Sequence, residues 1–161
     1  MNSDMCVPCD DGIINIRVGA IIIKNGKILM VENENCGYYY SVGGRIKFGE
    51  TAEQAVIREV YEETGVKLKI DRLLYVVENY FLGDSPAKAG KTVYEISFFY
   101  LMKTPDDFEP LCQSITEDGY SEFLSWVKLD TEKKMYPTFF KTELKNISDD
   151  VKFFSIDDRN R

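Results

Sequence analysis

Three glutamates with helical spacing are the residues whose types and positions best suit chemistry. Glu59, Glu62 and Glu63 fall within little more than one turn of a predicted helix, so their side chains share one arc roughly 100° wide. Glu59 and Glu63 form an i, i+4 like-charge pair near the C-terminal end, where the helix dipole disfavours negative charge. A hard divalent cation, Mg²⁺ or Mn²⁺, turns this repulsion into attraction. The pattern indicates a metal site, with a charged solvent-facing surface as the alternative.

The residues before and within this helix fit a supporting role. Gly43-Gly44 allows a tight backbone turn and leaves a carbonyl free to face an ion. Glu50 lies near the helix start, where it can pair with Arg58, and Arg58 can also reach Glu62 one turn later. We therefore expect Glu50 and Arg58 to be structural supports of the carboxylates.

The composition excludes several other kinds of chemistry. The chain has 161 residues and no histidine, which removes Ser–His–Asp and Cys–His relays, His-ligated zinc or haem, and phosphohistidine intermediates. Its formal net charge of −7 argues against general nucleic-acid binding and against an anionic-membrane surface. The apolar stretches are too short to span a bilayer, and the N-terminus lacks the pattern of a secretory signal. We expect a cytoplasmic protein.

The cysteine pattern leaves a second, weaker hypothesis open. Cys6 and Cys9 form a C-x-x-C, which occurs in redox-active sites and in zinc sites. Cys36 and Cys112 are isolated, and the pair precedes the first predicted strand, so we interpret it as two loosely held terminal thiols. A thiol redox protein stays an alternative without supporting sequence context.

The hydrophobic pattern predicts one domain over residues 1–161, with residues 1–12 as an N-terminal extension. Thr51 and Gln54 form a capping box and Gly65 is a helix stop, which predicts the helix over residues 51–64 with Val56, Ile57, Val60 and Thr64 facing the core. Asn25-Gly26 predicts a type I′ hairpin. A second helix is expected near Pro137, and residues 104–119 form an acidic loop. Strands are expected over residues 13–23, 27–32, 38–42, 68–82, 92–102 and 123–129. The order indicates an α/β sandwich with a mixed sheet.

Residues 44–66, GRIKFGETAEQAVIREVYEETGV, carry a family resemblance. The segment resembles the Nudix box, G-x5-E-x7-R-E-U-x-E-E-x-G-U with U aliphatic, at every specified position. The nine positions are filled by Gly44, Glu50, Arg58, Glu59, Val60, Glu62, Glu63, Gly65 and Val66. The resemblance implies an αβα sandwich with a mixed β-sheet between helices.

The resemblance also implies an activity. Nudix hydrolases cleave a nucleoside diphosphate linked to another moiety, using Mg²⁺ or Mn²⁺ and an activated water that attacks a phosphorus of the diphosphate. Carried over to this sequence, Glu59, Glu62 and Glu63 are the metal ligands, with the Gly44 carbonyl as a further ligand. The partner is then a nucleotide-type small molecule, and many relatives are homodimers. A non-catalytic nucleotide-binding module of the same fold is the alternative, although this chain keeps every box carboxylate.

The resemblance leaves the general base and the substrate contacts open. Glu59, Glu117 and Glu122 are candidates for the base. Glu95, an acid within an apolar strand, is a candidate for the base or for a substrate contact, with a salt-bridged or solvent-facing strand residue as the alternative. Arg17 can bind phosphate, or be an ordinary edge-strand charge, and Tyr40 can stack on a base or simply pack in the sheet.

Overall fold

The computed structural model describes residues 2–85, 87–111 and 119–160. The described part contains ten strands in one sheet and two helices. The strands are β1 (Cys6–Cys9), β2 (Gly12–Ile21), β3 (Ile23–Lys24), β4 (Lys27–Asn33), β5 (Tyr38–Arg45), β6 (Lys69–Leu82), β7 (Thr92–Lys103), β8 (Glu122–Lys128), β9 (Lys134–Tyr136) and β10 (Lys152–Asp157). The helices are α1 (Ala52–Thr64) and α2 (Phe140–Glu143). None of the described helices is long and apolar enough to cross a membrane.

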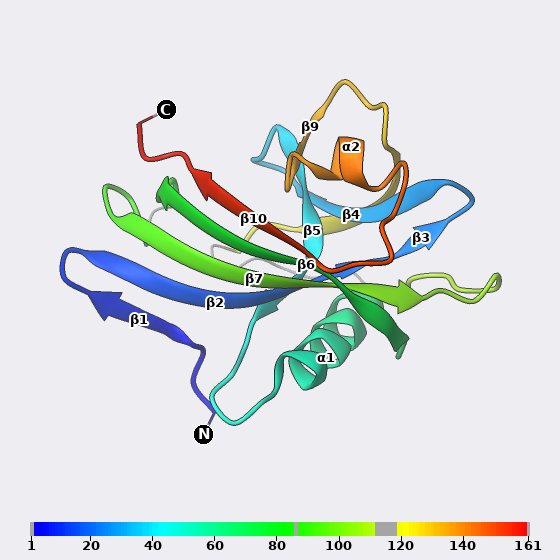
Figure 1. Cartoon of the computed structure of the whole chain (residues 1–161), viewed down its shortest axis with the longest axis horizontal. Coiled ribbons are helices and arrows are strands. Elements are labelled where there is room, and N and C mark those ends of the chain that lie inside the picture. The colour runs from blue at the N-terminus through cyan, green and yellow to red at the C-terminus, as the bar shows by residue number, and fades with distance from the viewer. Residues whose placement is uncertain (1, 86, 112–118, 161) are drawn as a thin grey trace.

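The sheet is mixed, as the sequence predicted. Its main path runs β10-β6-β7-β2-β5-β4-β3, while β1 pairs with β2, β8 with β4, and β9 with β5. The pairs β2–β7, β6–β10 and β5–β9 are parallel, and the other pairs are antiparallel. In Figure 1, α1 lies below the sheet and α2 above it. The two helices therefore cover different faces, and the predicted layered architecture is confirmed.

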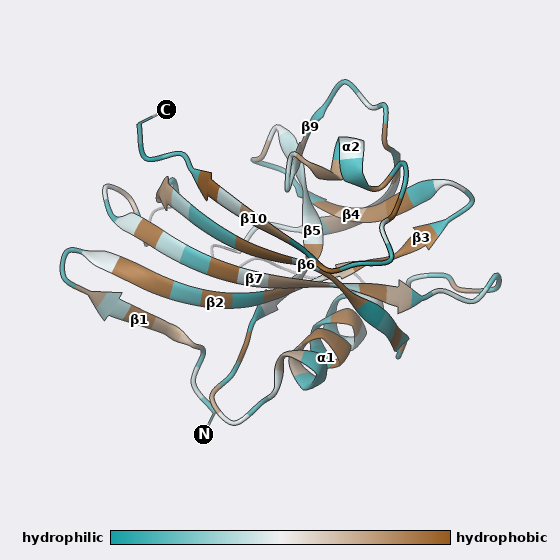
Figure 2. Ribbon diagram, in the orientation of Figure 1, coloured by the Kyte–Doolittle hydropathy of each residue, from teal (hydrophilic) through white to brown (hydrophobic). Residues whose placement is uncertain are grey.

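Each helix belongs to its own hydrophobic core, because successive residues of a strand point to opposite faces. Val56 and Val60 of α1 are fully buried in a cluster with Ala20 of β2. The next residue of β2, Ile21, belongs to a second cluster that contains Phe140 of α2. Figure 2 shows hydrophobic segments broken by hydrophilic ones along β2, and mixed hydropathy along α1. The β2 strand thus supports both layers.

Local sequence signals were reliable for α1 and for the first hairpin. The side chain of Thr51 accepts a hydrogen bond from the backbone N–H of Gln54, and the capping box is complete. Gly65 ends the helix in the left-handed conformation. Asn25 and Gly26 both have positive φ, 52° and 72°, as a type I′ turn requires. One core residue was predicted wrongly: Ile57 is 37% exposed, whereas Ala55 is buried.

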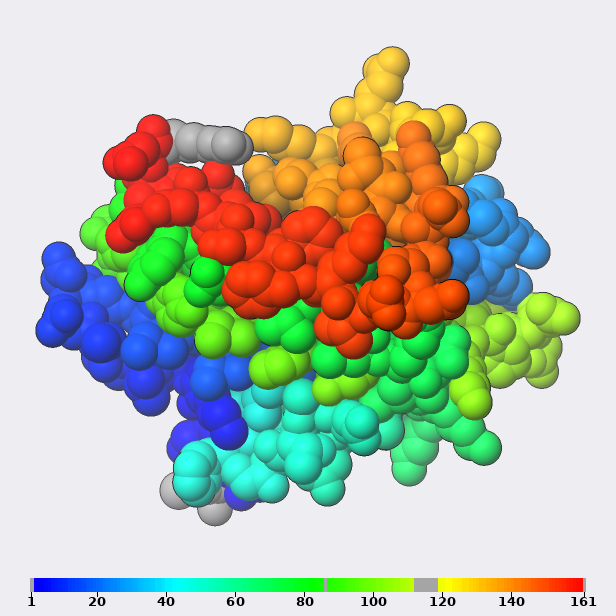
Figure 3. Space-filling model, in the orientation of Figure 1, coloured from blue at the N-terminus to red at the C-terminus, as the bar shows by residue number. Residues whose placement is uncertain are grey.

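The C-terminal part of the chain differs from the prediction. The second helix is a single turn that ends at Glu143, with Leu144 as its C-cap, and so stops before Ile147. The residues that follow favour a turn over a helix, and Asp150 N–H donates to the Ser148 hydroxyl at 3.1 Å. The tail then forms β10, which pairs in parallel with β6. In Figure 3 this red segment lies against the green β6 on the visible face.

Two expectations about residues that precede α1 also need correction. The C-x-x-C is part of strand β1, where Cys6 pairs with Asn15 and Cys9 with Gly12, rather than a loosely held end. The Gly43-Gly44 pair does not form a tight turn, because β5 runs through both glycines to Arg45. Within β5, Gly43 pairs with Gly19 of β2. Both glycines have another role, which the carboxylate site makes clear.

Candidate active site

Arg58 holds the acidic side chains of the α1 region together. Its Nε donates to Glu50 Oε1 at 2.6 Å, and its Nη2 donates to Glu50 Oε2 at 3.0 Å, so the pair is bidentate. Its Nη1 donates to Glu59 Oε1 at 2.7 Å and to Glu62 Oε2 at 3.2 Å. Nη2 also donates to the carbonyl of Arg45 at 3.0 Å, which joins α1 to β5. Both predicted partners of Arg58, Glu50 and Glu62, are confirmed.

Glu50 is a charged support on the side of Arg58 away from the other acids. Its Oε2 also accepts a hydrogen bond from the backbone N–H of Lys47 at 3.0 Å. The hydrogen bond with Arg58 holds the pKa of Glu50 below its usual value. The carboxylate is therefore ionised at neutral pH and fixes the guanidinium that reaches Glu59 and Glu62.

The two glycines of β5 are needed for close approach. A Cβ at Gly44 would lie 2.5 Å from both Cδ and Oε1 of Glu59, so only glycine leaves room for this carboxylate. Gly43 has a φ of 147°, and a Cβ there would lie 2.1 Å from the carbonyl oxygen of Val18. The glycines thus bring β5 against both β2 and α1.

Glu63 and Glu59 are crowded acids. Glu63 accepts a hydrogen bond from the backbone N–H of Gly43 at 3.1 Å. Burial, and then the negative charges of Glu59 and Glu122, raise the pKa of Glu63 well above its usual value. Burial also raises the pKa of Glu59, against the opposing effect of Arg58. A positive charge close to these groups would relieve the repulsion.

The donor set suits a hard divalent cation, because it consists of carboxylates and backbone carbonyls. Within the described ranges, no three acidic or cysteine side chains converge as a ready-made metal cage. Each carboxylate is held by another partner: Glu59 and Glu62 by Arg58, and Glu63 by Gly43. The chemistry of these donors fits a metal, while the ligand roles of Gly44, Glu59, Glu62 and Glu63 stay predictions.

A late strand contributes one more acid to this region. The hydroxyl of Tyr40 donates to Glu122 Oε1 at 2.7 Å, and Asn33 Nδ2 donates to that hydroxyl at 3.4 Å. Burial and the hydrogen bond with Glu122 raise the pKa of Tyr40, so the tyrosine stays a donor. Because Glu122 also raises the pKa of Glu63, it lies near the box glutamates. Of the other base candidates, Glu117 lies outside the described residues.

Arg17 and Glu95 occupy neighbouring positions on the sheet. Arg17 pairs with Arg45 across β2 and β5, and its positive charge partly opposes the rise in the pKa values of Glu59 and Glu63 that burial causes. Glu95 accepts a hydrogen bond from Asn15 Nδ2 at 2.7 Å, and Arg45 Nε donates to Asn15 Oδ1 at 3.2 Å. Arg17 therefore lies close enough to act on the carboxylates, whereas Glu95 belongs to a hydrogen-bonded strand network.

Sequence reasoning missed two contributors to this site. Asn15 is fully buried and links Glu95 to Arg45, and the Arg45 carbonyl accepts from Arg58. The role of Asn15 could have been predicted from the sequence, because a polar residue among isoleucines needs a buried partner. The role of the Arg45 carbonyl could not, since every residue type has a backbone carbonyl.

Comparisons with known proteins agree with this geometry. Residues 14–146 match the model of the NUDIX domain. The chain is 34% identical over 108 residues to an ADP-ribose pyrophosphatase of Methanocaldococcus jannaschii, covering 56% of this chain and 64% of the relative. It is 38% identical over 93 residues to a putative 8-oxo-dGTP diphosphatase, YtkD, of Bacillus subtilis, covering 58% and 56%. The matches thus span less than two thirds of these relatives.

Solved structures share the fold. A mutator MutT protein from Bacillus halodurans superposes with a TM-score of 0.66 at 20% identity, over 91% of each chain. A MutT NUDIX hydrolase from Burkholderia pseudomallei gives a TM-score of 0.59 at 27% identity, over 81% of this chain and 96% of that one. The domain match covers most of the chain and contains the whole carboxylate cluster, so this protein belongs to the Nudix family.

Proposed function

We propose that this protein is a pyrophosphohydrolase that depends on Mg²⁺ or Mn²⁺ and hydrolyses a nucleoside diphosphate linked to another moiety. The observation that carries the proposal is the contact between α1 and β5, where the Glu59 carboxylate lies against Gly44 and Arg58 holds both Glu59 and Glu62. This arrangement holds mutually repelling carboxylates close together in fixed positions. A helix surface with a purely structural role would not require such an arrangement.

The residues of the cluster divide the work between binding and support. Glu59, Glu62, Glu63 and the Gly44 carbonyl would hold the metal, while Glu50 and Arg58 keep the first two carboxylates in place. When bound, such ions neutralise the diphosphate and lower the pKa of water. Catalysis then needs positioning and charge stabilisation more than a covalent nucleophile, which agrees with a chain that has no histidine.

The general base is proposed among the acids that share this region. Glu59 and Glu63 have raised pKa values, which suits a group that takes up a proton near neutral pH. Glu122 is a further candidate, with its orientation set by the hydroxyl of Tyr40. In this arrangement Tyr40 positions an acid, which differs from the base-stacking role considered from the sequence.

Arg17 is the proposed phosphate contact. It extends from β2 beside Arg45, and it acts electrostatically on both Glu59 and Glu63. A guanidinium there can bind phosphate oxygens in a bidentate manner while the carboxylates hold the ions. The relatives named for ADP-ribose and for 8-oxo-dGTP support a nucleotide substrate. Because these two substrates differ in the group that is released, the names do not identify the leaving group.

The proposal is tested by turnover on a panel of substrates. Purified protein with Mg²⁺ or Mn²⁺ should release a nucleotide from at least one of the NDP-sugars, ADP-ribose, dinucleotides and (d)NTPs. Glu62→Gln should reduce this turnover at least 100-fold, because it removes one carboxylate charge from the predicted metal site. Circular dichroism should be unchanged, since Glu62 is half-exposed.

Glu53→Gln is the matched control, because Glu53 is an exposed acid in the first turn of the same helix. It should keep nearly full activity. Equal activity of wild type and Glu62→Gln would refute the metal role. Tight nucleotide binding without turnover on any substrate would instead favour a non-catalytic binding module.

A further inference from the structure

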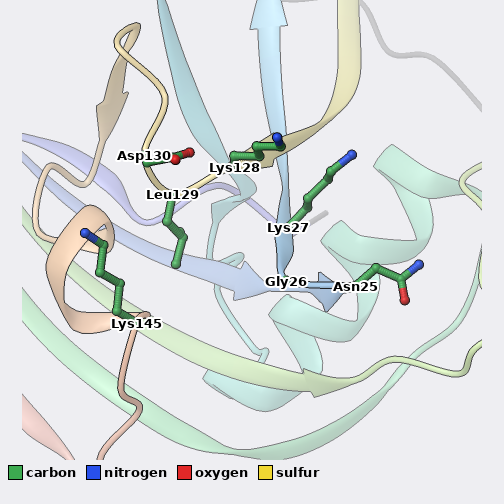
Figure 4. A pocket seen from close by; sticks show the side chains of 7 residues that line it. All are labelled: Asn25, Gly26, Lys27, Lys128, Leu129, Asp130 and Lys145. Atoms are coloured by element: carbon green, nitrogen blue, oxygen red, sulfur yellow. The ribbon is translucent and has the colours of Figure 1, made fainter.

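An open hollow of about 430 Å³ lies at the end of the β3–β4 hairpin, beside the end of β8. Figure 4 shows the seven residues that line it, from three separate parts of the chain. They are Asn25, Gly26, Lys27, Lys128, Leu129, Asp130 and Lys145. The hairpin supplies the first three, β8 and the turn after it supply the next three, and the segment after α2 supplies the last.

The charge of this hollow is opposite to that of the chain. Three lysines and one aspartate line it, although the formal net charge of the protein is −7. Several other lysines are neutralised: Lys24 pairs with Glu109, and Lys152 with Glu143. Over residues 2–85, 87–111 and 119–160, no ion pair involves a lysine of the hollow. Their charges are left for a ligand.

Two of the lysines are held side by side by the backbone. Lys27 lies directly opposite Lys128 in the antiparallel β4–β8 pair, and both side chains extend toward the same side in Figure 4. Directly opposed like charges destabilise a sheet, and an anion bound between them removes that cost. Lys145 stands on the other side of Leu129 in Figure 4, so an extended anion would meet positive charge at both ends of the hollow.

The hollow is separate from the carboxylate site. Along β4 and β8, the pair Lys27–Lys128 is at one end and the pair Asn33–Glu122 is at the other. At about 3.3 Å per residue, these ends are roughly 20 Å apart. A second hollow of about 230 Å³, which shares Gly26, Lys27, Leu129 and Lys145 with the first, adds Ile23, Ile28 and Leu144. It gives the lysines an apolar wall.

The geometry points to a second anion site in this hollow, one that binds the phosphate groups of a polyphosphate-bearing ligand through Lys27, Lys128 and Lys145. Lysine ammoniums bind phosphate as point charges, and the adjoining apolar wall would accept a less polar part of the same ligand. The ligand is either a free polyphosphate or nucleotide, or the phosphates of a nucleic-acid strand. This site does not depend on the proposed hydrolase activity.

The test is a titration of the full chain with tripolyphosphate, followed by amide NMR in the presence of EDTA. EDTA removes divalent ions, so the carboxylates of the proposed active site repel the anionic probe. Binding under these conditions is then expected at the hollow and not at the active site. We expect saturable shifts at the amides of Gly26, Lys27, Lys128 and Leu129, and at least tenfold weaker binding in the K27Q/K128Q variant. A single-stranded oligonucleotide is the second probe. Saturation by either probe supports the site, and their relative affinity identifies the source of the phosphate.

The matched control is K69Q/K103Q. Lys69 and Lys103 also face one another across two antiparallel strands, both are exposed, and neither lines the hollow. This variant removes the same number of charges and should change the affinity less than twofold. Equal weakening in the two double variants, or the absence of saturable shifts at the hollow with both probes, would overturn the proposal.

Discussion

The carboxylate of Glu59 fills the space that a side chain at position 44 would need. A Cβ there would lie 2.5 Å from Cδ and Oε1 of Glu59. The atoms in the way are the end of a flexible side chain, so Gly44→Ala should displace the carboxylate rather than break the fold. We expect at least a tenfold loss of turnover, because small misplacements of catalytic groups are costly, and a loss of about 1 kcal/mol or less in the free energy of unfolding.

Gly37→Ala is the control for this substitution. A Cβ at Gly37 would meet nothing within 4 Å, and Gly37 has no positive φ. Its turnover and its urea unfolding curve should match those of the wild type. If Gly44→Ala keeps wild-type turnover, the Glu59 carboxylate is not held in a position that matters for the reaction.

Tyr75 is a buried residue whose hydroxyl costs stability. Its side chain is only 2% exposed, and over the described residues its hydroxyl has no hydrogen-bond partner. Tyr75→Phe removes this unsatisfied group, so we expect the free energy of unfolding to rise by about 1 kcal/mol. Tyr94→Phe is the comparison, because Tyr94 donates to Glu78 at 2.8 Å and its loss should not stabilise the protein.

The same tyrosine gives a pH signature. Burial raises the pKa of Tyr75 to about 12 from its usual 10.0. Between these values the unfolded chain loses the proton while the folded chain keeps it, so the stability from this group falls as the pH rises. Tyr75→Phe should therefore lose less stability than the wild type between pH 10 and pH 12, measured by urea unfolding. Parallel pH curves for the two proteins would contradict a buried, protonated hydroxyl.

At the scale of elements, β1 decides what the C-x-x-C can do. Cys6 and Cys9 are three residues apart in a strand, so their side chains point to opposite faces and their Cα atoms are about 10 Å apart. A disulfide requires a Cα separation below about 7 Å. The structure therefore speaks against redox pairing of these two thiols within the sheet.

We expect mild oxidation of the folded protein to leave the Cys6–Cys9 segment without an internal disulfide. Peptide mass spectrometry would detect such a bond as the loss of two hydrogens, and full unfolding before oxidation is the positive control. The C6S/C9S variant should keep the hydrolase activity of the wild type. A disulfide formed in the native state would show that β1 detaches from β2 readily.

The helix ends and the turn that the sequence predicted have local causes. The capping box, the helix stop and the Asn25-Gly26 turn are each decided within a few residues, and all three are confirmed. The second helix was predicted near Pro137 but is shorter than expected, and the strand β10 was not predicted, because β10 exists through its pairing with the distant β6. Propensity cannot identify such a partner.

Within the candidate site too, contacts between residues close along the chain were predictable and contacts between distant residues were not. The contacts of Arg58 with Glu50 and Glu62 were predictable, since each joins residues that are close along the chain. The bond between Tyr40 and Glu122 joins residues 82 positions apart, and it appears only once β4 pairs with both β5 and β8. The sequence named both residues, although it gave no sign that they form one unit.

At the scale of the whole molecule, acidic and basic side chains lie at opposite ends of the β4–β8 pair. Glu122, at one end of β8, lies near the acidic α1 cluster, and Lys128, at the other end, lies in the lysine hollow. The net charge of −7 is therefore not evenly spread. Because burial and neighbouring charges raise the pKa of Glu63, we expect the acidic part to lower the stability of the fold where the proposed chemistry takes place.

Glu63 offers the clearest measurement of that cost. Burial and the charges of Glu59 and Glu122 raise its pKa, so the ionised form is disfavoured in the folded protein. For an acid with a raised pKa, stability is lost as the pH rises above the unfolded value of 4.5. Glu63→Gln removes the charge and keeps an oxygen that can accept from Gly43 N–H. In EDTA at neutral pH, we expect Glu63→Gln to be about 1 kcal/mol more stable than the wild type, or a few degrees higher in Tm.

The same substitution should reverse the order of stability when Mg²⁺ is added. A ligand that binds only the folded state raises its stability, by about 2.7 kcal/mol at 100 times the Kd, and the wild type keeps the carboxylate that Glu63→Gln lacks. Calorimetry of both proteins should therefore give the variant the higher Tm in EDTA and the wild type the higher Tm with Mg²⁺. Glu53→Gln, which changes an exposed acid of the same helix, should follow the wild type in both conditions. A variant that is less stable than the wild type in EDTA would mean that Glu63 supports the fold, and a Tm gain with Mg²⁺ equal in the two proteins would remove Glu63 from the predicted metal ligands.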